Sequence, residues 1–138
     1  MQAVPKSTQW ARENKDKVRD AYLQRKGTLH GKLTTLITSS RQRCRKSGHD
    51  HEVDTAFLLE LYGLQEGLCA LSGKEMTIQG ERGTYEYWHS ISLDRIDSSR
   101  GYTKDNVQLV CTGVNYMKKD MNEEDFVEFC RCIVEVSG

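Results

Sequence analysis

The chain has 138 residues, of which 37% are hydrophobic and 29% charged, so one domain with a modest core is expected. No run of 18 apolar residues occurs, which excludes a predicted membrane-spanning helix, and the first residues lack the apolar region of a secretory signal. We therefore expect a cytoplasmic protein without membrane partners, whose five scattered cysteines are reduced thiols rather than disulfides.

The formal net charge of zero conceals two halves of opposite charge. Residues 1–48 hold 12 Lys and Arg against 3 Asp and Glu, a net charge of +9, whereas residues 49–138 hold 8 against 17, a net charge of −9. Such asymmetry is typical of a basic arm that binds a polyanion, beside a body with another task. The alternative is that the two halves attract each other. We divide the chain into a basic helical arm, residues 1–48, and a domain of residues 49–138.

Two amphipathic helices are predicted in the basic half. The first covers residues 8–26, and its apolar face has a helical spacing that favours core packing over base stacking. That face consists of Trp10, Val18 and Tyr22. The second helix begins after Thr28 and ends at Gly48. Its last turns are rich in cations, which the helix dipole explains only in part.

Shorter elements are predicted in the acidic half. A helix begins after Asp54 and stops at Gly63 to Gly67, and a loop-rich region or β-hairpin follows until a strand at Trp88–Leu93. Three further elements are expected: a strand at Val107–Cys111, a helix at Val114–Asp120, and a last helix opened by Asn122. The apolar stripe of the last helix is Phe126, Phe129, Cys130 and Ile133.

The order strand, loop, strand, helix between His89 and Lys118 predicts a ββα unit. In such a unit Asp94 ends the first strand and Asn115 lies in the first turn of the helix, so the two side chains can converge on one hard divalent cation. Asn106, at the end of the loop, can hydrogen-bond to loop backbone and fix its shape.

The segment Ser92–Lys118, SLDRIDSSRGYTKDNVQLVCTGVNYMK, resembles the HNH endonucleases of the ββα-metal superfamily, in the small free-standing form common in phages. The family motif has an Asp or His followed by a catalytic His, then a structural Asn, then a His or Asn nine residues on. Asn106 and Asn115 are nine residues apart. The resemblance extends over roughly residues 65–118 and includes QEGLCALSG at 65–73.

This resemblance implies an α+β fold, in which a ββα-metal nuclease core (a short antiparallel hairpin packed on a helix) carries additional N-terminal and C-terminal helices. It implies Asp94 and Asn115 as metal ligands, Asn106 as the loop-fixing residue, and Mg²⁺ or Mn²⁺ as the cofactor. The implied function is hydrolysis of phosphodiester bonds in double-stranded DNA, by nicking or by double-strand cleavage. If the protein is phage-encoded, it would act in the cytoplasm of the bacterial host.

One departure from the motif concerns the general base, because Arg95 stands where the family has its catalytic His. A guanidinium does not deprotonate in a protein, although it can bind a phosphate oxygen and stabilise charge in the transition state. The base could be His49, His51 or His89, or no protein group at all. The alternative function is a catalytically impaired HNH-fold protein that binds DNA or regulates a partner, and an RNase or toxin nuclease also remains open.

A second departure concerns zinc. Many relatives carry two CxxC pairs that bind a structural zinc, whereas here Cys69 is followed by Ser72 and Cys111 by Val114. Two thiolates fall short of the four ligands of such a site, so structural zinc is not expected. Cys69 and Cys111 are interpreted as buried, small apolar residues that can touch each other.

The basic half is expected to add affinity for DNA without sequence information, through phosphate contacts. The residues predicted to contact DNA are Arg41, Arg43, Arg45, Lys46, Arg100 and Lys118. The predicted catalytic set is Asp94, Arg95, Asn106 and Asn115.

Overall fold

The computed structural model of the protein describes residues 14–16 and 27–138. At its centre is an antiparallel pair of strands, β1 (Ile91–Arg95) and β2 (Val107–Cys111). Helix α6 (Thr112–Lys118) follows β2 directly, and it packs against both strands. The predicted ββα unit and the α+β class are confirmed.

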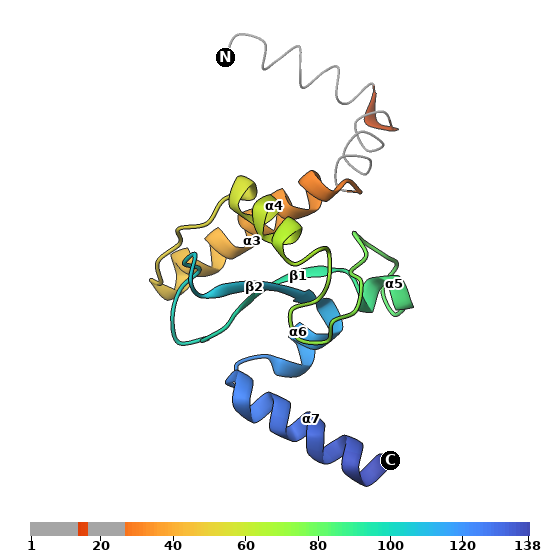
Figure 1. Cartoon of the computed structure of the whole chain (residues 1–138). Helices are drawn as coiled ribbons and strands as arrows, with labels where there is room; N and C mark the ends of the chain where they lie inside the picture. Colours follow the sequence, from red (N-terminus) through yellow and green to blue (C-terminus); the bar gives the residue numbers. More distant parts are fainter. Residues whose placement is uncertain (1–13, 17–26) are drawn as a thin grey trace.

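Two helices cover the other face of the hairpin, as Figure 1 shows: α3 (Leu29–Ser47) and α4 (Thr55–Leu64). Both begin as predicted, because the side chains of Thr28 and Asp54 accept hydrogen bonds from backbone N–H groups of the first turn. Helix α3 ends at Gly48, whose φ of 79° is the left-handed conformation that glycine adopts without steric cost.

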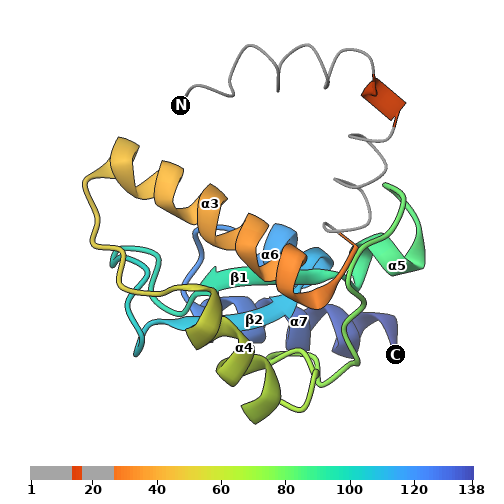
Figure 2. The same cartoon turned by 90° about the horizontal axis from the view of Figure 1, so that it is seen from above.

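Helix α3 lies across the hairpin (Figure 2) and shares its core. Leu33 and Ile37, one turn apart on α3, are 0% and 3% exposed, and they belong to the same cluster as Leu93 and Leu109 of the two strands. Helix α3 lies before the predicted domain boundary at residue 48, and α4 and the hairpin lie after it. All of them contribute to the same hydrophobic core. The helix predicted at residues 8–26 lies almost entirely outside the described residues.

The start of the first strand differs from the prediction. Residues 85–88 form a single helical turn, α5 (Tyr85–Trp88), capped by Thr84, so the first strand begins only at Ile91. Helix α4 passes through Gly63, which has helical backbone here, and the chain reverses at Glu66 and Gly67, both with positive φ. The helix ends at Leu64, within the range from Gly63 to Gly67 that the sequence predicts for its end.

Helix α7 (Glu123–Ser137) begins at Asn122, whose side chain caps the first turn as predicted. Of the apolar stripe that the sequence predicts, only Phe126 is buried, at 7% exposure. Phe129 and Ile133 are 60% and 62% exposed. The reason is visible in Figure 1, where α7 runs away from the hairpin after its first turn, so no other described element covers its later turns.

No helix within residues 14–16 and 27–138 is both long and apolar enough to cross a bilayer.

Candidate functional site

A cavity of about 580 Å³ lies beside strand β1, between helices α3 and α6. Strand β1 contributes Asp94 and Arg95 to its wall, and helix α6 contributes Asn115. Helix α3 adds Arg43, and the loop between the strands adds Tyr102. The ββα unit thus brings three of the four predicted catalytic residues to one cavity, and Asn106 lies behind it in the same loop.

The carboxylate of Asp94 points toward α6 rather than into solvent, and its side chain is 4% exposed. Lys118 Nζ lies 3.2 Å from both carboxylate oxygens, and Gln108 Nε2 donates to Oδ2 at 3.0 Å. Gln108 can do so because it is the cross-strand partner of Asp94 in the hairpin register. The carboxylate is thus held firmly, by a buried cation on one side and a carboxamide on the other.

The orientation of Asn115 is determined by strand β1. Its Nδ2 donates to Ser92 Oγ at 2.6 Å and to the carbonyl oxygen of Leu93 at 3.5 Å. Its Oδ1 has no hydrogen-bond partner within the described part of the chain. A carboxamide whose nitrogen is tied to the protein keeps its oxygen available as a ligand for a hard cation.

Asn106 is 1% exposed and fixes the loop between the strands, as its position in the sequence predicts. Its Nδ2 donates to the carbonyl oxygens of Asp97 and Gly101 at 3.0 and 2.8 Å, and its Oδ1 accepts from the N–H of Asp97 at 2.9 Å. One buried side chain therefore closes a loop that includes Tyr102.

Tyr102 is the cavity residue that the sequence did not reveal. Its hydroxyl accepts a hydrogen bond from Arg43 Nε at 2.9 Å, and the guanidinium carbons of Arg43 and Arg95 lie 5.5 and 5.1 Å from its ring centre. Arg95 also donates to the carbonyl oxygen of Arg100 at 3.0 Å. Tyr102 thus contacts two arginines, Arg43 and Arg95, and Arg95 occupies the position at which the family motif has its catalytic His. Because Arg43 is distant in sequence, no local motif could have indicated this contact.

Of the three histidines considered as bases, His51 lies nearest to this tyrosine. Its ring centre is 5.7 Å from that of Tyr102, and its Nε2 lies 2.7 Å from Ser40 Oγ. Partial burial, and then the neighbouring charges of Arg41 and Arg43, lower the pKa of His51, which favours the neutral imidazole. His51 does not line the cavity, although its ring packs against a residue that does.

His49 and His89 do not reach the cavity either. His49 Nδ1 is buried and has no hydrogen-bond partner among residues 14–16 and 27–138. His89 stacks on Tyr85 at 3.7 Å and lines a different cavity, of about 540 Å³, with Trp88 and Met117. His89 ends the turn of α5 and lines this other cavity, so the four residues between it and Asp94 do not bend back toward the site.

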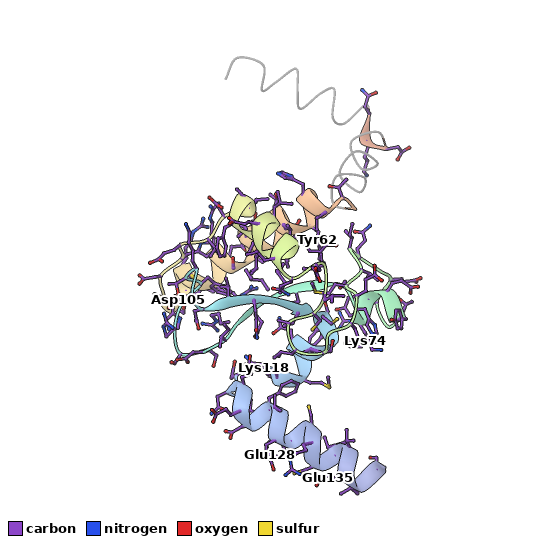
Figure 3. All side chains as sticks on the ribbon, in the orientation of Figure 1. Tyr62, Lys74, Asp105, Lys118, Glu128 and Glu135 are labelled. Carbon is purple, nitrogen blue, oxygen red and sulfur yellow. The ribbon has the colours of Figure 1, made fainter. Side chains whose placement is uncertain are left out.

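The residues predicted to contact DNA fall into different surroundings. Four are exposed on the last turns of α3, namely Arg41, Arg43, Arg45 and Lys46. Arg100 forms an ion pair with Asp105 at 2.9 Å on the surface of the loop between β1 and β2, where Figure 3 labels Asp105. Lys118 is different: it is 0% exposed and points at Asp94, so it cannot contact DNA in this arrangement. Its partner is Asp94 of the adjacent strand rather than a phosphate.

Cys69 and Cys111 are both buried and touch each other, as the N–H of Cys111 donates to Cys69 Sγ at 3.2 Å. Burial, followed by the neighbouring Cys69, raises the pKa of Cys111 to about 11, so this side chain is a thiol at neutral pH. The N–H of Ser72 also donates to Cys69 Sγ, at 3.4 Å. The two cysteines and Ser72 lie together where the relatives of the motif have zinc ligands.

Within the described residues, no three His, Cys, Asp or Glu side chains gather to form a metal site. The cavity is lined by two carboxylates, Asp94 and Asp120, and the predicted ligand pair in it consists of the Asp94 carboxylate and the carboxamide oxygen of Asn115. Two hard oxygen ligands of this kind suit Mg²⁺ or Mn²⁺, which keeps several water molecules and completes its octahedron with phosphate oxygens. The residues present therefore fit such an ion.

A hairpin whose loop is closed by a buried asparagine, followed by a helix that crosses it, defines an HNH-type nuclease fold. Comparison with solved structures agrees: the chain is similar to the rare-cutting HNH restriction endonuclease PacI, with a TM-score of 0.54 over 75% of this chain and 78% of that one. The two sequences are 20% identical, so the likeness establishes the fold. No protein-family model and no curated protein matches the sequence.

Proposed function

We propose that the protein is a metal-dependent endonuclease that hydrolyses phosphodiester bonds in double-stranded DNA. One observation carries the proposal: the cavity beside β1 contains Asp94, Asn115 and Arg95 in an HNH-type fold. The structural neighbour PacI is described as a restriction endonuclease that perturbs DNA, which supports DNA as the substrate.

In the proposed site, Asp94 and the free oxygen of Asn115 would hold Mg²⁺ or Mn²⁺. When bound, the ion supplies polarisation of the scissile phosphate and stabilises charge on the departing oxygen. Gln108 and Lys118 hold the Asp94 carboxylate, and Ser92 holds the Asn115 carboxamide, so both ligands are oriented before DNA arrives.

Arg95 and Arg43 would bind oxygens of the same phosphate. Both guanidinium groups border the cavity, and a guanidinium matches a phosphate with two parallel hydrogen bonds. The hydroxyl of Tyr102, already hydrogen-bonded to Arg43, would orient the attacking water. A proton released by that water would pass to bulk solvent or to a phosphate oxygen, so the absence of the usual histidine does not prevent hydrolysis.

The exposed cations at the end of α3 would hold the DNA backbone. The same helix carries Arg43, which lines the cavity, and the exposed Arg41, Arg45 and Lys46. A DNA backbone bound by these exposed cations would therefore run toward the cavity. Contacts of this kind add affinity without reading sequence.

The direct test is cleavage of supercoiled plasmid in Mg²⁺ or Mn²⁺. We expect the natural protein to convert the plasmid to open-circular or linear form, which distinguishes nicking from double-strand cleavage.

Asp94→Ala and Asn115→Ala should lower the cleavage rate at least about 100-fold. Asp105→Ala should not, because Asp105 is an exposed carboxylate outside the cavity. Equal cleavage by Asp94→Ala and the natural protein would contradict the assigned site. Single-stranded RNA, assayed in parallel, tests the alternative substrate.

Two observations favour a second candidate, an HNH-fold protein that binds DNA without cutting it. Arg95 replaces the usual base, and the Asp94 carboxylate already has Lys118 as a partner. Salt-sensitive DNA binding without cleavage in any divalent metal would support this candidate. Arg95→His separates the two: a large gain of activity indicates an impaired base, whereas a loss indicates a positive role for the arginine.

A further inference from the structure

The buried ammonium of Lys118 is a built part of the candidate site. Its side chain is 0% exposed, and its Nζ contacts three oxygens: both carboxylate oxygens of Asp94 at 3.2 Å and the carbonyl oxygen of Arg95 at 3.0 Å. An ammonium has three N–H groups, so each can point at one of these acceptors. Figure 3 shows Lys118 on the side of the hairpin where α6 lies. Lys118 therefore stays beside Asp94 as a fixed cation.

The surroundings of Asp94 leave one of its oxygens more accessible than the other. Oδ2 accepts a hydrogen bond from Gln108 and lies 3.2 Å from Lys118 Nζ, whereas Oδ1 accepts from Lys118 and from no other described residue. The nitrogen of Gln108 also donates to Glu123 Oε1 at 2.8 Å, so Gln108 cannot turn away without losing two contacts. A cation ligated by Asp94 would therefore share the carboxylate with Lys118.

The cavity as a whole is short of negative charge. The charged side chains that line it are three cations, Arg43, Arg95 and Lys119, and two anions, Asp94 and Asp120. Adding Lys118 and Glu123, which lie behind Asp94, leaves four cations against three anions. With Asn115 neutral and Lys118 cancelling the charge of Asp94, the pair of proposed ligands offers a dication almost no net attraction.

We infer that Lys118 is an internal counter-ion that keeps the divalent ion from binding tightly until a DNA phosphate enters the cavity. The phosphate would supply the negative charge that the protein lacks, together with oxygen ligands. Metal and DNA would then bind cooperatively, and the free protein would hold little metal. This inference rests on the proposed function, because it takes Asp94 and Asn115 as the metal ligands.

The test measures uptake of Mn²⁺ from the electron paramagnetic resonance signal of the free ion, with the whole protein, alone and with a short DNA duplex. The duplex without protein provides the background. The variants are Lys118→Met and Lys118→Gln, of which the second keeps a hydrogen-bond donor near Asp94 if the first does not fold. Lys119→Met is the matched control, because Lys119 is exposed, lines the same cavity and does not contact Asp94.

We expect the natural protein and Lys119→Met to bind Mn²⁺ at least about tenfold more tightly with the duplex than without it. Both Lys118 variants should bind it about tenfold more tightly than the natural protein when no duplex is present, since groups behind the ligands change metal affinity by about 10–100-fold. Mn²⁺ should also raise the melting temperature of these variants more than that of the natural protein.

Equal affinity of the natural protein and the Lys118 variants in the absence of DNA would overturn the inference, and Lys118 would then have a purely structural role. A different result would defeat the proposed function itself: no Mn²⁺ uptake by any variant with the duplex, or undiminished uptake by Asp94→Ala. The two failures are therefore distinguishable.

Discussion

Asn106 is a single side chain that determines the shape of a functional loop. Its three hydrogen bonds join the two ends of the segment from Asp97 to Gly101, and the Asn106 side chain that makes them is buried. A buried backbone group that loses its partner costs the protein about 1–3 kcal/mol.

Asn106→Ala should therefore lower the free energy of unfolding by about 2–4 kcal/mol and displace Tyr102 from the cavity. Urea unfolding followed by tryptophan fluorescence measures the first effect, and plasmid cleavage the second. Asp105→Asn, the adjacent exposed residue, should leave the urea midpoint almost unchanged. A stable Asn106→Ala variant would mean that the loop is held by other contacts.

His51 makes stability depend on pH. Its pKa is lowered in the folded protein, by burial first and by Arg41 and Arg43 next, so the unfolded chain binds the proton more readily. Stability should then fall as pH drops below about 6.5, the ordinary pKa of histidine, and continue to fall until the folded form is also protonated. Thermal melts at about pH 7.5 and pH 5 should show a larger loss for the natural protein than for His51→Gln. Equal losses would remove His51 as a cause.

At the scale of elements, α3 is both a basic surface and a part of the core. Leu33 is 0% exposed against the hairpin, so Leu33→Ala should cost about 2–5 kcal/mol of unfolding free energy. Leu64, at the end of α4, is 76% exposed, so Leu64→Ala should change the free energy of unfolding by less than about 0.5 kcal/mol. If α3 were a detachable arm, Leu33→Ala would leave the unfolding of the hairpin unchanged, and hydrogen exchange of β1 and β2 would show it.

Backbone contacts join the segment after α3 to the loop between β1 and β2. The N–H of Tyr102 donates to the carbonyl oxygen of Asp50 at 2.9 Å, and a Cβ on Gly101 would lie 2.1 Å from that same oxygen. Gly101→Ala should therefore separate the two segments and destabilise the protein by about 1–3 kcal/mol or more, measured by urea unfolding. Gly63→Ala is the matched control, because a Cβ there meets nothing within 4 Å and should stabilise α4 by about 0.5–1 kcal/mol.

Local signals in the sequence predicted most elements and the pair Asp94 and Asn115, which the structure brings to one cavity. Helix caps at Thr28, Asp54 and Asn122 depend on contacts within one turn, and the nine-residue spacing of Asn106 and Asn115 is a property of one ββα unit. The rest depends on long-range contacts. Neither the tyrosine between Arg43 and Arg95 nor the burial of Lys118 could be read from neighbours in sequence. The exposure of α7 also escaped prediction, because an amphipathic stripe does not reveal whether a partner is present.

For the whole molecule, the separation of charge predicts how DNA binding responds to salt. Replacing Arg41, Arg45 and Lys46 by alanine removes three exposed cations of α3 and leaves Arg43 in the cavity. The slope of log affinity against log salt concentration should become shallower by about 3, and affinity should fall alike for unrelated DNA sequences. Fluorescence anisotropy over a range of salt concentrations measures both. Arg131→Ala, on α7, should leave the slope as it is.

The contact between Gln108 and Glu123 has a practical consequence for anyone who shortens this protein. The later turns of α7 expose Phe129, Ile133 and Val136, and a crystallographer would be inclined to remove the helix to improve solubility. A chain that stopped before Glu123 would also lose the second acceptor of Gln108, and with it one restraint on Asp94. A C-terminal truncation should begin after Phe126, because it then keeps the first turn of α7 and removes the exposed apolar residues of the later turns. The beginning of the last helix thus supports the candidate site, and its end does not.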